Sequence, residues 1–143
     1  MTLAQQILWG SAFLGVCVVV QVTFMGVAAH IMVLIGARLR RIGRSIHVSS
    51  LLAIALTAII GALTAQVWIW AWIYIRYDIL ADLNSAVYFS LVTFTSLGYG
   101  DIVLGPELRI FAAFGSVTGL LAFGLSTAFM VASMSRRFGD QDV

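Results

Sequence analysis

The sequence predicts an all-α membrane protein with three membrane-spanning helices and one short re-entrant half-helix. The chain has 143 residues, a mean hydropathy of +1.05, and only eight basic and six acidic side chains. This balance is typical of helical membrane proteins. The apolar residues form three runs that are long enough to cross ~30 Å of hydrocarbon, and a fourth run that is too short.

The first predicted span runs from about Ile7 to Ile35 and is interrupted only by Gln21, Thr23 and His30. A secretory signal peptide is the alternative, because residues 27–29 resemble a small-residue cleavage site. No basic residue precedes the run, and the run is too long for such a peptide. We therefore interpret it as a spanning helix in which Gln21 packs between helices.

Arginines mark one side of the membrane. Four of the eight lie between positions 38 and 44, and Arg136 and Arg137 follow the last apolar run. Cytoplasmic loops carry such an excess of basic residues, so we expect the 38–44 loop and the C-terminus to be cytoplasmic and the N-terminus to be outside. Binding to nucleic acid or anionic lipid is a weaker explanation of the cluster. We therefore predict a multi-pass integral membrane protein of a prokaryotic plasma membrane, with membrane lipids as partners.

The second predicted span runs from about Val48 to Tyr74 and contains Gln66. Aromatic side chains at spacing two end it, and we expect them to form a belt at the outer interface: Trp68, Trp70, Trp72 and Tyr74. The single cysteine, Cys17, lies in the first span and is expected to pack or to face lipid, so no disulfide is possible within the chain.

A short apolar run at residues 86–94 follows Asp82 and Asn84, either of which can cap a helix. The run is too short to span, so it predicts a re-entrant half-helix. The irregular backbone after it is tolerable at membrane depth only if it is buried in protein or lines water.

The last predicted span runs from about Leu108 to Met134. Pro106 is expected in its first helical turn, with Glu107 near the positive end of the helix dipole. The chain then divides into an N-terminal helix with a basic loop (1–47), a second module (48–137) and a short tail (138–143).

Residues 95–101, between the half-helix and the last span, read Thr-Ser-Leu-Gly-Tyr-Gly-Asp. Glycine adopts backbone conformations that most residues avoid, and such conformations let successive carbonyls point at one cation. The order of span, half-helix, Gly-Tyr-Gly and span resembles the tetrameric potassium channel pore family over about residues 50–135. The resemblance implies a homotetramer, K⁺ as the permeant ion and no organic cofactor.

The resemblance also implies that Thr95 to Gly100 form one quarter of a selectivity filter, with Asp101 at its outer mouth. Four backbone carbonyls would bind K⁺, those of Ser96, Leu97, Gly98 and Tyr99, and the Ser96 hydroxyl would line the innermost site. The family usually has threonine and then valine or isoleucine at positions 96 and 97. Serine keeps the oxygen but loses the methyl group, and Leu97 is expected to repack against the half-helix, which predicts a softer filter.

Filter support is assigned to Tyr88, Phe89, Val92 and Thr93. The Tyr88 hydroxyl can donate to Asp101, whereas Phe89 has no donor and Val92 has no carboxyl group. Simple packing of Tyr88 and Phe89 is the alternative.

In the last span, Gly119 occupies the position of the family's gating hinge. Gly115 and Gly119 also form a Gly-x-x-x-Gly face, and close helix packing is an equal alternative. A cytoplasmic gate is predicted among four residues: Thr127, Phe129, Val131 and Met134.

His30 and His47 could sense protons, although most interfacial histidines only form hydrogen bonds. The first span has no spaced arginines, so it does not resemble a voltage sensor, and the six residues after Arg137 are too few for a ligand-binding domain. Gating is therefore expected from the pore itself, lipid, protons or a separate regulatory protein.

The favoured hypothesis is a passive, potassium-selective channel. A less selective monovalent cation channel, a transporter subunit and a non-conducting membrane interaction protein are the alternatives. No nucleophile, metal cluster or phosphate loop in the sequence indicates an enzyme.

Overall fold

The structure is a computed structural model that describes residues 1–39 and 44–138, with side chains described for 1–35 and 48–135. Over these residues the only regular elements are helices, and there is no strand. The elements are α1 (Leu3–Leu39), α2 (Arg44–Arg76), α3 (Leu83–Phe94) and α4 (Arg109–Phe138). The predicted all-α fold class is confirmed.

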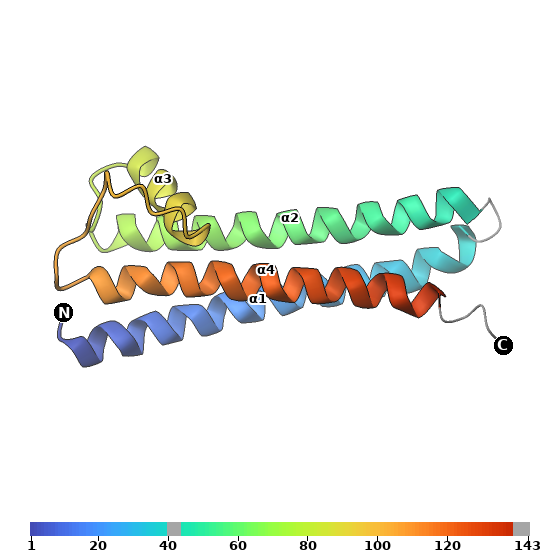
Figure 1. The fold of residues 1–143 in the computed structure, drawn as a ribbon, viewed down its shortest axis with the longest axis horizontal. Coiled ribbons are helices and arrows are strands. Elements are labelled where there is room, and N and C mark those ends of the chain that lie inside the picture. The colour runs from blue at the N-terminus through green and yellow to red at the C-terminus, as the bar shows by residue number, and fades with distance from the viewer. Residues whose placement is uncertain (40–43, 139–143) are drawn as a thin grey trace.

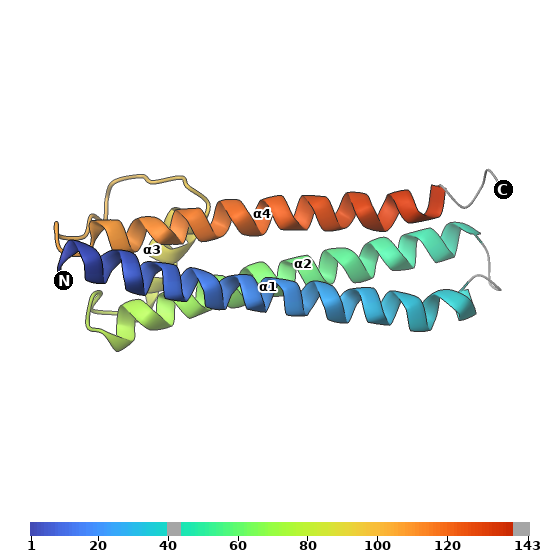
Figure 2. The same ribbon diagram turned by 90° about the horizontal axis from the view of Figure 1, so that it is seen from below.

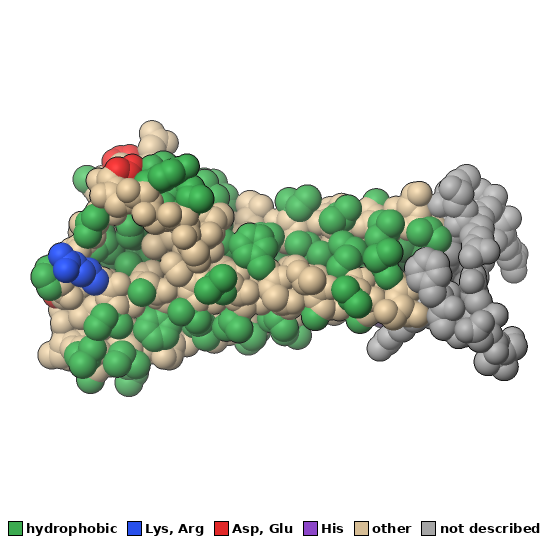
Figure 3. All heavy atoms as spheres, viewed as in Figure 1, with side chains coloured by type: hydrophobic (Ala, Val, Ile, Leu, Met, Phe, Trp, Pro, Cys, Tyr) green, Lys and Arg blue, Asp and Glu red, His purple; other side chains and the backbone are tan. Residues whose placement is uncertain are grey.

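Three helices are long and apolar enough to cross a membrane, over Leu3–Ile35, Val48–Arg76 and Arg109–Ser135. They lie along one another, and the short α3 is tucked against one end of the bundle (Figure 1). Apolar side chains are spread along the length of the visible face, and the charged side chains that are drawn in colour lie near the end that holds α3 (Figure 3). The protein is therefore an integral membrane protein with three spans.

The first helix packs within its own chain. α1 contacts both α2 and α4 but not α3, which lies against α2 and α4 instead. The view from below shows α1 running beside α2 and α4 over most of their length (Figure 2). Because α1 and α4 both start at the end that holds α3, they run parallel to each other.

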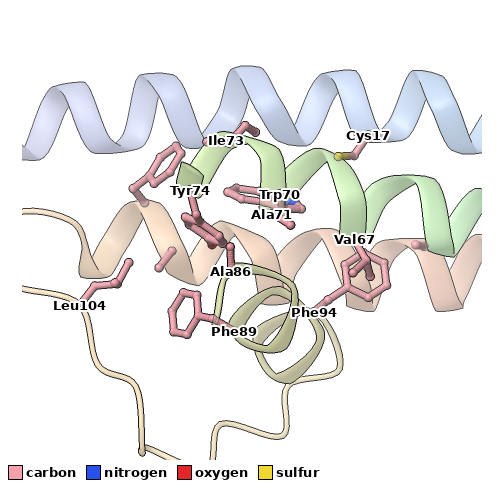
Figure 4. Close-up of a cluster of buried hydrophobic side chains, with 13 residues drawn as sticks. Cys17, Val67, Trp70, Ala71, Ile73, Tyr74, Ala86, Phe89, Phe94 and Leu104 are labelled. Atoms are coloured by element: carbon pink, nitrogen blue, oxygen red, sulfur yellow. The ribbon is translucent and has the colours of Figure 1, made fainter. Parts of the chain in front are cut away.

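An aromatic core holds the α3 end of the bundle together (Figure 4). Trp70 and Tyr74 of α2 are almost completely buried. The Trp70 ring packs against Phe13 of α1 and Phe111 of α4, with ring centroids 6.3 Å and 5.5 Å away. Tyr74 meets the edge of Phe89 of α3 at 5.2 Å. Aromatic contacts therefore join all four helices, and they set the position of α3.

The predicted aromatic belt is only half correct. Trp68 and Trp72 are exposed, as an interfacial belt requires, but Trp70 and Tyr74 belong to the core. Residues two positions apart lie about 200° apart around a helix axis, so the four aromatic residues fall on two opposite faces. One pair therefore faces lipid while the other faces α1, α3 and α4. Cys17, for which packing and lipid contact were both considered, is buried in the same core.

Buried polar side chains link α1 to both other spans. The amide nitrogen of Gln66 donates to Gln21 Oε1 (2.6 Å), and the amide nitrogen of Gln21 donates to the Ser126 hydroxyl (3.0 Å). Ser126 in turn donates to the Ala122 carbonyl (2.7 Å). All three polar side chains are buried. Gln21 therefore joins helices, as the sequence suggested.

A second link lies near the start of α4. Gln6 Oε1 of α1 accepts hydrogen bonds from the backbone N–H groups of Ile110 (3.1 Å) and Phe111 (3.3 Å). The first N–H groups of a helix lack partners within the helix, so the buried Gln6 acts as a cap from another helix. Gln6 and Gln21 together fix α1 along α4.

The start of α4 differs from the expectation. α4 begins at Arg109, so Pro106 and Glu107 lie in the preceding turn and not in the first helical turn. That turn is closed by the Leu108 N–H, which donates to the Gly105 carbonyl (2.9 Å). Gln6, and not a residue of this turn, provides the cap.

We expect Gln21→Leu combined with Ser126→Ala in a double-mutant cycle to give a coupling free energy of about 0.6 kcal/mol, and not more than about 1.7 kcal/mol. The reason is that a buried hydrogen bond between membrane helices is replaced by apolar contact. The measurement is reversible unfolding in mixed micelles. Thr23→Val is the control, because the Thr23 hydroxyl bonds only to the Val19 carbonyl of its own helix. A coupling free energy of zero would contradict a role for Gln21 in joining α1 to α4.

Candidate functional site: a row of aligned carbonyls

The half-helix begins where a side chain caps it. Asp82 is the N-cap residue of α3, and its carboxylate accepts a hydrogen bond from the Ser85 N–H (2.9 Å). Of the two predicted caps, Asp82 is the one used. The bond favours the charged form and lowers the pKa of Asp82. The 12 residues of α3 rise about 18 Å, which is too little to cross the membrane.

The chain that follows α3 turns its N–H groups back toward the helix. The N–H of Ser96 donates to the Thr93 carbonyl (2.9 Å), and the N–H groups of Leu97 and Gly98 both donate to the Val92 carbonyl (2.9 Å and 3.3 Å). The C-terminal carbonyls of a helix normally lack partners. Here residues 95–101, called the filter segment below, supply N–H groups as partners.

Planarity of the peptide bond then fixes the carbonyls. In a trans peptide the C=O of one residue points opposite to the N–H of the next. The carbonyls of Thr95, Ser96 and Leu97 therefore point together, away from α3. Within the described part of the chain, no carbonyl from residue 96 to 100 accepts a hydrogen bond. A row of free acceptors at membrane depth requires a ligand or water.

Backbone angles show how the chain keeps this orientation. Ser96, Gly98 and Gly100 have positive φ angles of 58°, 55° and 78°, whereas Leu97 and Tyr99 between them do not. Alternation between left- and right-handed conformations turns successive peptide groups the same way. Glycine takes positive φ without a Cβ penalty, which accounts for its place at 98 and 100. Ser96 takes this conformation with a side chain.

The filter segment is exposed in a single chain. Leu97 is 55% exposed and Tyr99 is 68% exposed, although both side chains are largely apolar. The expected repacking of Leu97 against the half-helix is not seen in the single chain, where the Leu97 N–H faces α3 and the side chain is exposed.

At the far end of the segment, the predicted hydrogen bond between Tyr88 and Asp101 is present. The Tyr88 hydroxyl donates to Asp101 Oδ2 over 2.6 Å. The bond stabilises the charged carboxylate, so it lowers the pKa of Asp101 and raises the pKa of Tyr88. The side chains of Phe89 and Val92, by contrast, are buried and apolar, so they form no hydrogen bond to the filter segment.

Two of the three glycines of α4, Gly115 and Gly119, face the end of α3. Gly115 lies beside Thr93, where an added Cβ would be 3.7 Å from the Thr93 Cβ. At Gly119 an added Cβ would overlap the Phe94 carbonyl oxygen and would lie 2.7 Å from its carbon. The Gly-x-x-x-Gly face is therefore a close-packing surface, and Gly119 is required for the approach of α3 to α4.

One supporting residue was missed from the sequence. The Ser116 hydroxyl of α4 donates to the Thr93 carbonyl (2.8 Å), the same oxygen that accepts the Ser96 N–H. The Thr93 hydroxyl donates to the Phe89 carbonyl. Ser116 lies between Gly115 and Gly119, and its position beside a small-residue face was the only signal that could have indicated it.

The predicted gate residues separate into two groups. Phe129 packs against a cluster formed with α1 and α2 by Met32, Leu51 and Ala55, so it faces its own chain. The other three are exposed and belong to one stripe that runs down α4 at alternating spacings of three and four: Ile110, Ala113, Val117, Leu120, Gly124, Thr127, Val131 and Met134. This pattern is typical of helix seams that pack on other helices or line a shared axis.

The two histidines do not lie near the filter segment in sequence. His30 is exposed on α1. The side chain of His47 and the arginines from 38 to 44 lie outside the described side chains.

Comparison with known proteins identifies the family. The family model described as "Ion channel" matches residues 58–136, which is more than half of the chain. The chain belongs to this ion channel family. The match begins inside α2, includes α3 and the filter segment, and ends near the end of α4. No curated protein and no solved structure gave a significant match. Family membership thus agrees with the two-span pore module inferred from the sequence, and α1 is an additional helix outside the matched segment.

Proposed function

We propose that this ion channel protein is a passive, potassium-selective channel in which four copies of the chain surround one axis. The observation that carries the proposal is the row of carbonyls from Thr95 to Leu97, held in one direction by the bonds to Val92 and Thr93. Stacked rings of such carbonyls replace the hydration shell of a dehydrated cation. In this proposal the carbonyls of Gly98 and Tyr99, which accept no hydrogen bond within the described chain, would continue the row toward Asp101.

Assembly as a tetramer is supported by what a single chain leaves uncovered. One filter segment supplies ligands on one side of an ion only, so several copies are needed to enclose it. The exposed stripe of α4 and the exposed Leu97 and Tyr99 side chains lie where copies would meet. Along this stripe, we propose Thr127, Val131 and Met134 for the cytoplasmic constriction. Phe129 packs within its own chain instead.

Helix electrostatics supports a cation in the pore. The C-terminal end of α3 carries a partial negative charge and precedes the filter segment directly. The cluster of arginines and the positions of Asp78, Asp82, Asp101 and Glu107 support an outward-facing filter mouth. We propose that the N-terminus is outside and the C-terminus is cytoplasmic.

The test is ion flux into liposomes that contain the purified protein. We expect K⁺ uptake that Ba²⁺ blocks, with Na⁺ permeating at least about tenfold more slowly. Equal permeation by K⁺ and Na⁺ would favour the less selective cation channel, for which the Ser96 and Leu97 departures are the sequence reason. Absence of flux from a folded tetramer would overturn the proposal and favour a non-conducting protein.

Tyr88→Phe is expected to hasten the decay of current during sustained opening, because the outer mouth loses the bond that holds Asp101. In the wild type the pKa of Asp101 lies below its ordinary value of 3.8. The bond is therefore fully present above about pH 4 and is lost as the external pH falls through the lowered pKa.

In Tyr88→Phe the Asp101 pKa should return upward, so acid effects on the current should begin at a higher external pH than in the wild type. Both changes are measured on the same proteoliposome patches. Tyr77→Phe is the matched control, since Tyr77 is exposed and lies outside the filter. Unchanged current decay in Tyr88→Phe would count against the support role of this bond.

A further inference from the structure

A cavity of about 650 Å³ lies at the end of the bundle that holds α3, away from the carbonyl row. It is formed by three parts of the chain: the start of α1, the link between α2 and α3, and the link between the filter segment and α4. Its volume lies within the range of pockets that bind small molecules. The proposed pore does not use this cavity, and three of its lining residues, Met1, Trp9 and Phe13, lie in α1 or just before it, outside the segment that matches the family.

The floor of the cavity is apolar and well packed. Phe111 and Leu104 line it and are 3% and 8% exposed. Phe13 lies beside Phe111 with ring centroids 6.0 Å apart, edge to face. The floor is held by the aromatic core and by the Gln6 cap, which bonds to the Phe111 N–H. It therefore offers a preformed surface for an apolar group.

The rim is aromatic and acidic. Trp9 and Tyr77 line it and are 44% and 57% exposed, and the Trp9 ring stacks on Phe13 at 6.0 Å. The charged side chains among the lining residues are those of Asp78 and Glu107. Among the described residues, neither carboxylate forms an ion pair or a hydrogen bond. Arg109 does not line the cavity, and its guanidinium donates to the Leu104 carbonyl (3.2 Å).

Both carboxylates line the cavity from the turns on either side of it. Asp78 has a positive φ of 51° in the turn after α2. The Glu107 carboxylate lies over Gly105, where an added Cβ would be 2.9 Å from the carboxylate carbon. Even with the Met1 ammonium counted as a cation, the lining keeps a net negative charge. Aromatic faces and carboxylates are the groups that attract organic cations.

We propose that this cavity binds an organic ammonium ion that carries an apolar group. The apolar group would occupy the floor at Phe111 and Leu104. The ammonium would lie at the rim between the aromatic rings and the carboxylates of Asp78 and Glu107. This binding requires only the folded chain, and it does not depend on whether the protein conducts ions.

The test uses 3-phenylpropyltrimethylammonium as the probe and the full-length protein in nanodiscs of zwitterionic lipid, with affinity measured by titration calorimetry. We expect binding that weakens about tenfold in Asp78→Asn/Glu107→Gln, because the attraction of two carboxylates is removed. Asparagine also tolerates the positive φ at 78. The neutral analogue, with carbon in place of the nitrogen, should also bind about tenfold more weakly.

A second variant tests the place of binding. Val103 lines the cavity and is 66% exposed, so Val103→Trp should fill the space without disturbing the core and should abolish binding. Two controls should bind like the wild type. Asp140→Asn/Asp142→Asn removes the same charge near the C-terminus, and Val33→Trp adds the same ring at a 75% exposed position on the other half of α1.

Three outcomes would overturn the proposal. Wild-type affinity in Asp78→Asn/Glu107→Gln would remove the role of the carboxylates. Wild-type affinity in Val103→Trp would exclude the cavity. If high K⁺ displaces the probe and Val103→Trp leaves its affinity unchanged, the probe binds at the filter segment and not in the cavity. None of these results depends on flux, so failure here is distinguishable from failure of the proposed channel function.

Discussion

Gly98→Ala is expected to reduce K⁺ flux by at least roughly a hundredfold. Gly98 has a φ of +55° in the filter segment, and its N–H is bonded to the Val92 carbonyl. An L-residue in this conformation costs about 1–2 kcal/mol in each chain, and four chains would bear it in the proposed tetramer. Nothing lies within 4 Å of the added Cβ in the chain, so the cost is conformational and not steric.

The measurement is K⁺ uptake into liposomes, with circular dichroism as the check on folding. Gly15→Ala is the matched control, because Gly15 lies in α1 with open space around it and without a positive φ. That variant should conduct like the wild type. A D-alanine placed at position 98 by semisynthesis should restore flux, since its mirror-image centre favours positive φ. Normal flux in Gly98→Ala would show that the carbonyl row does not require this conformation.

Gly119→Ala is expected to destabilise the folded chain by about 1–3 kcal/mol and to lower flux with it. The added methyl group would overlap the backbone carbonyl of Phe94, which cannot move without shifting the end of α3. The Thr93 and Val92 carbonyls that hold the filter segment lie in the same turn. Displacement of this turn therefore disturbs the site as well as the packing.

Reversible unfolding in mixed micelles and K⁺ flux are measured together for this variant. Gly26→Ala in α1 is the control, as nothing lies within 4 Å of the added Cβ, and it should stabilise the chain by about 0.5–1 kcal/mol. A hinge role for Gly119 makes a different prediction, namely normal or increased stability with altered gating. That result would contradict the packing role.

Local sequence signals predicted the elements well. Apolar run length gave three spans within a few residues of their observed ends, and Asp82 capped the half-helix as expected. The order of span, half-helix, glycine-rich segment and span was enough to predict the family that the comparison then found. The Tyr88–Asp101 bond was expected from the resemblance to the channel family, because the Tyr88 hydroxyl can donate to the Asp101 carboxylate.

Contacts between distant segments were predicted less well. Trp70 and Tyr74 were assigned to an interfacial belt, Phe129 was assigned to a gate, and Leu97 was expected behind the filter. In a membrane helix every face is apolar, so hydrophobicity does not distinguish a side chain that faces lipid from one that faces another helix. Ser116 and Gln6 were missed for the related reason that their partners are backbone groups of other helices.

The sequence by itself determined that the chain crosses the membrane three times and carries a glycine-rich segment after a half-helix. Those features depend on run length, charge and the conformational freedom of glycine, which are local properties. Only the tertiary structure decided that α1 packs on α2 and α4, that Gly119 is a contact and that three successive carbonyls share one direction. Each of these depends on where a partner from another part of the chain is placed, and residues 95–101 form a candidate site only because the end of α3 holds their N–H groups.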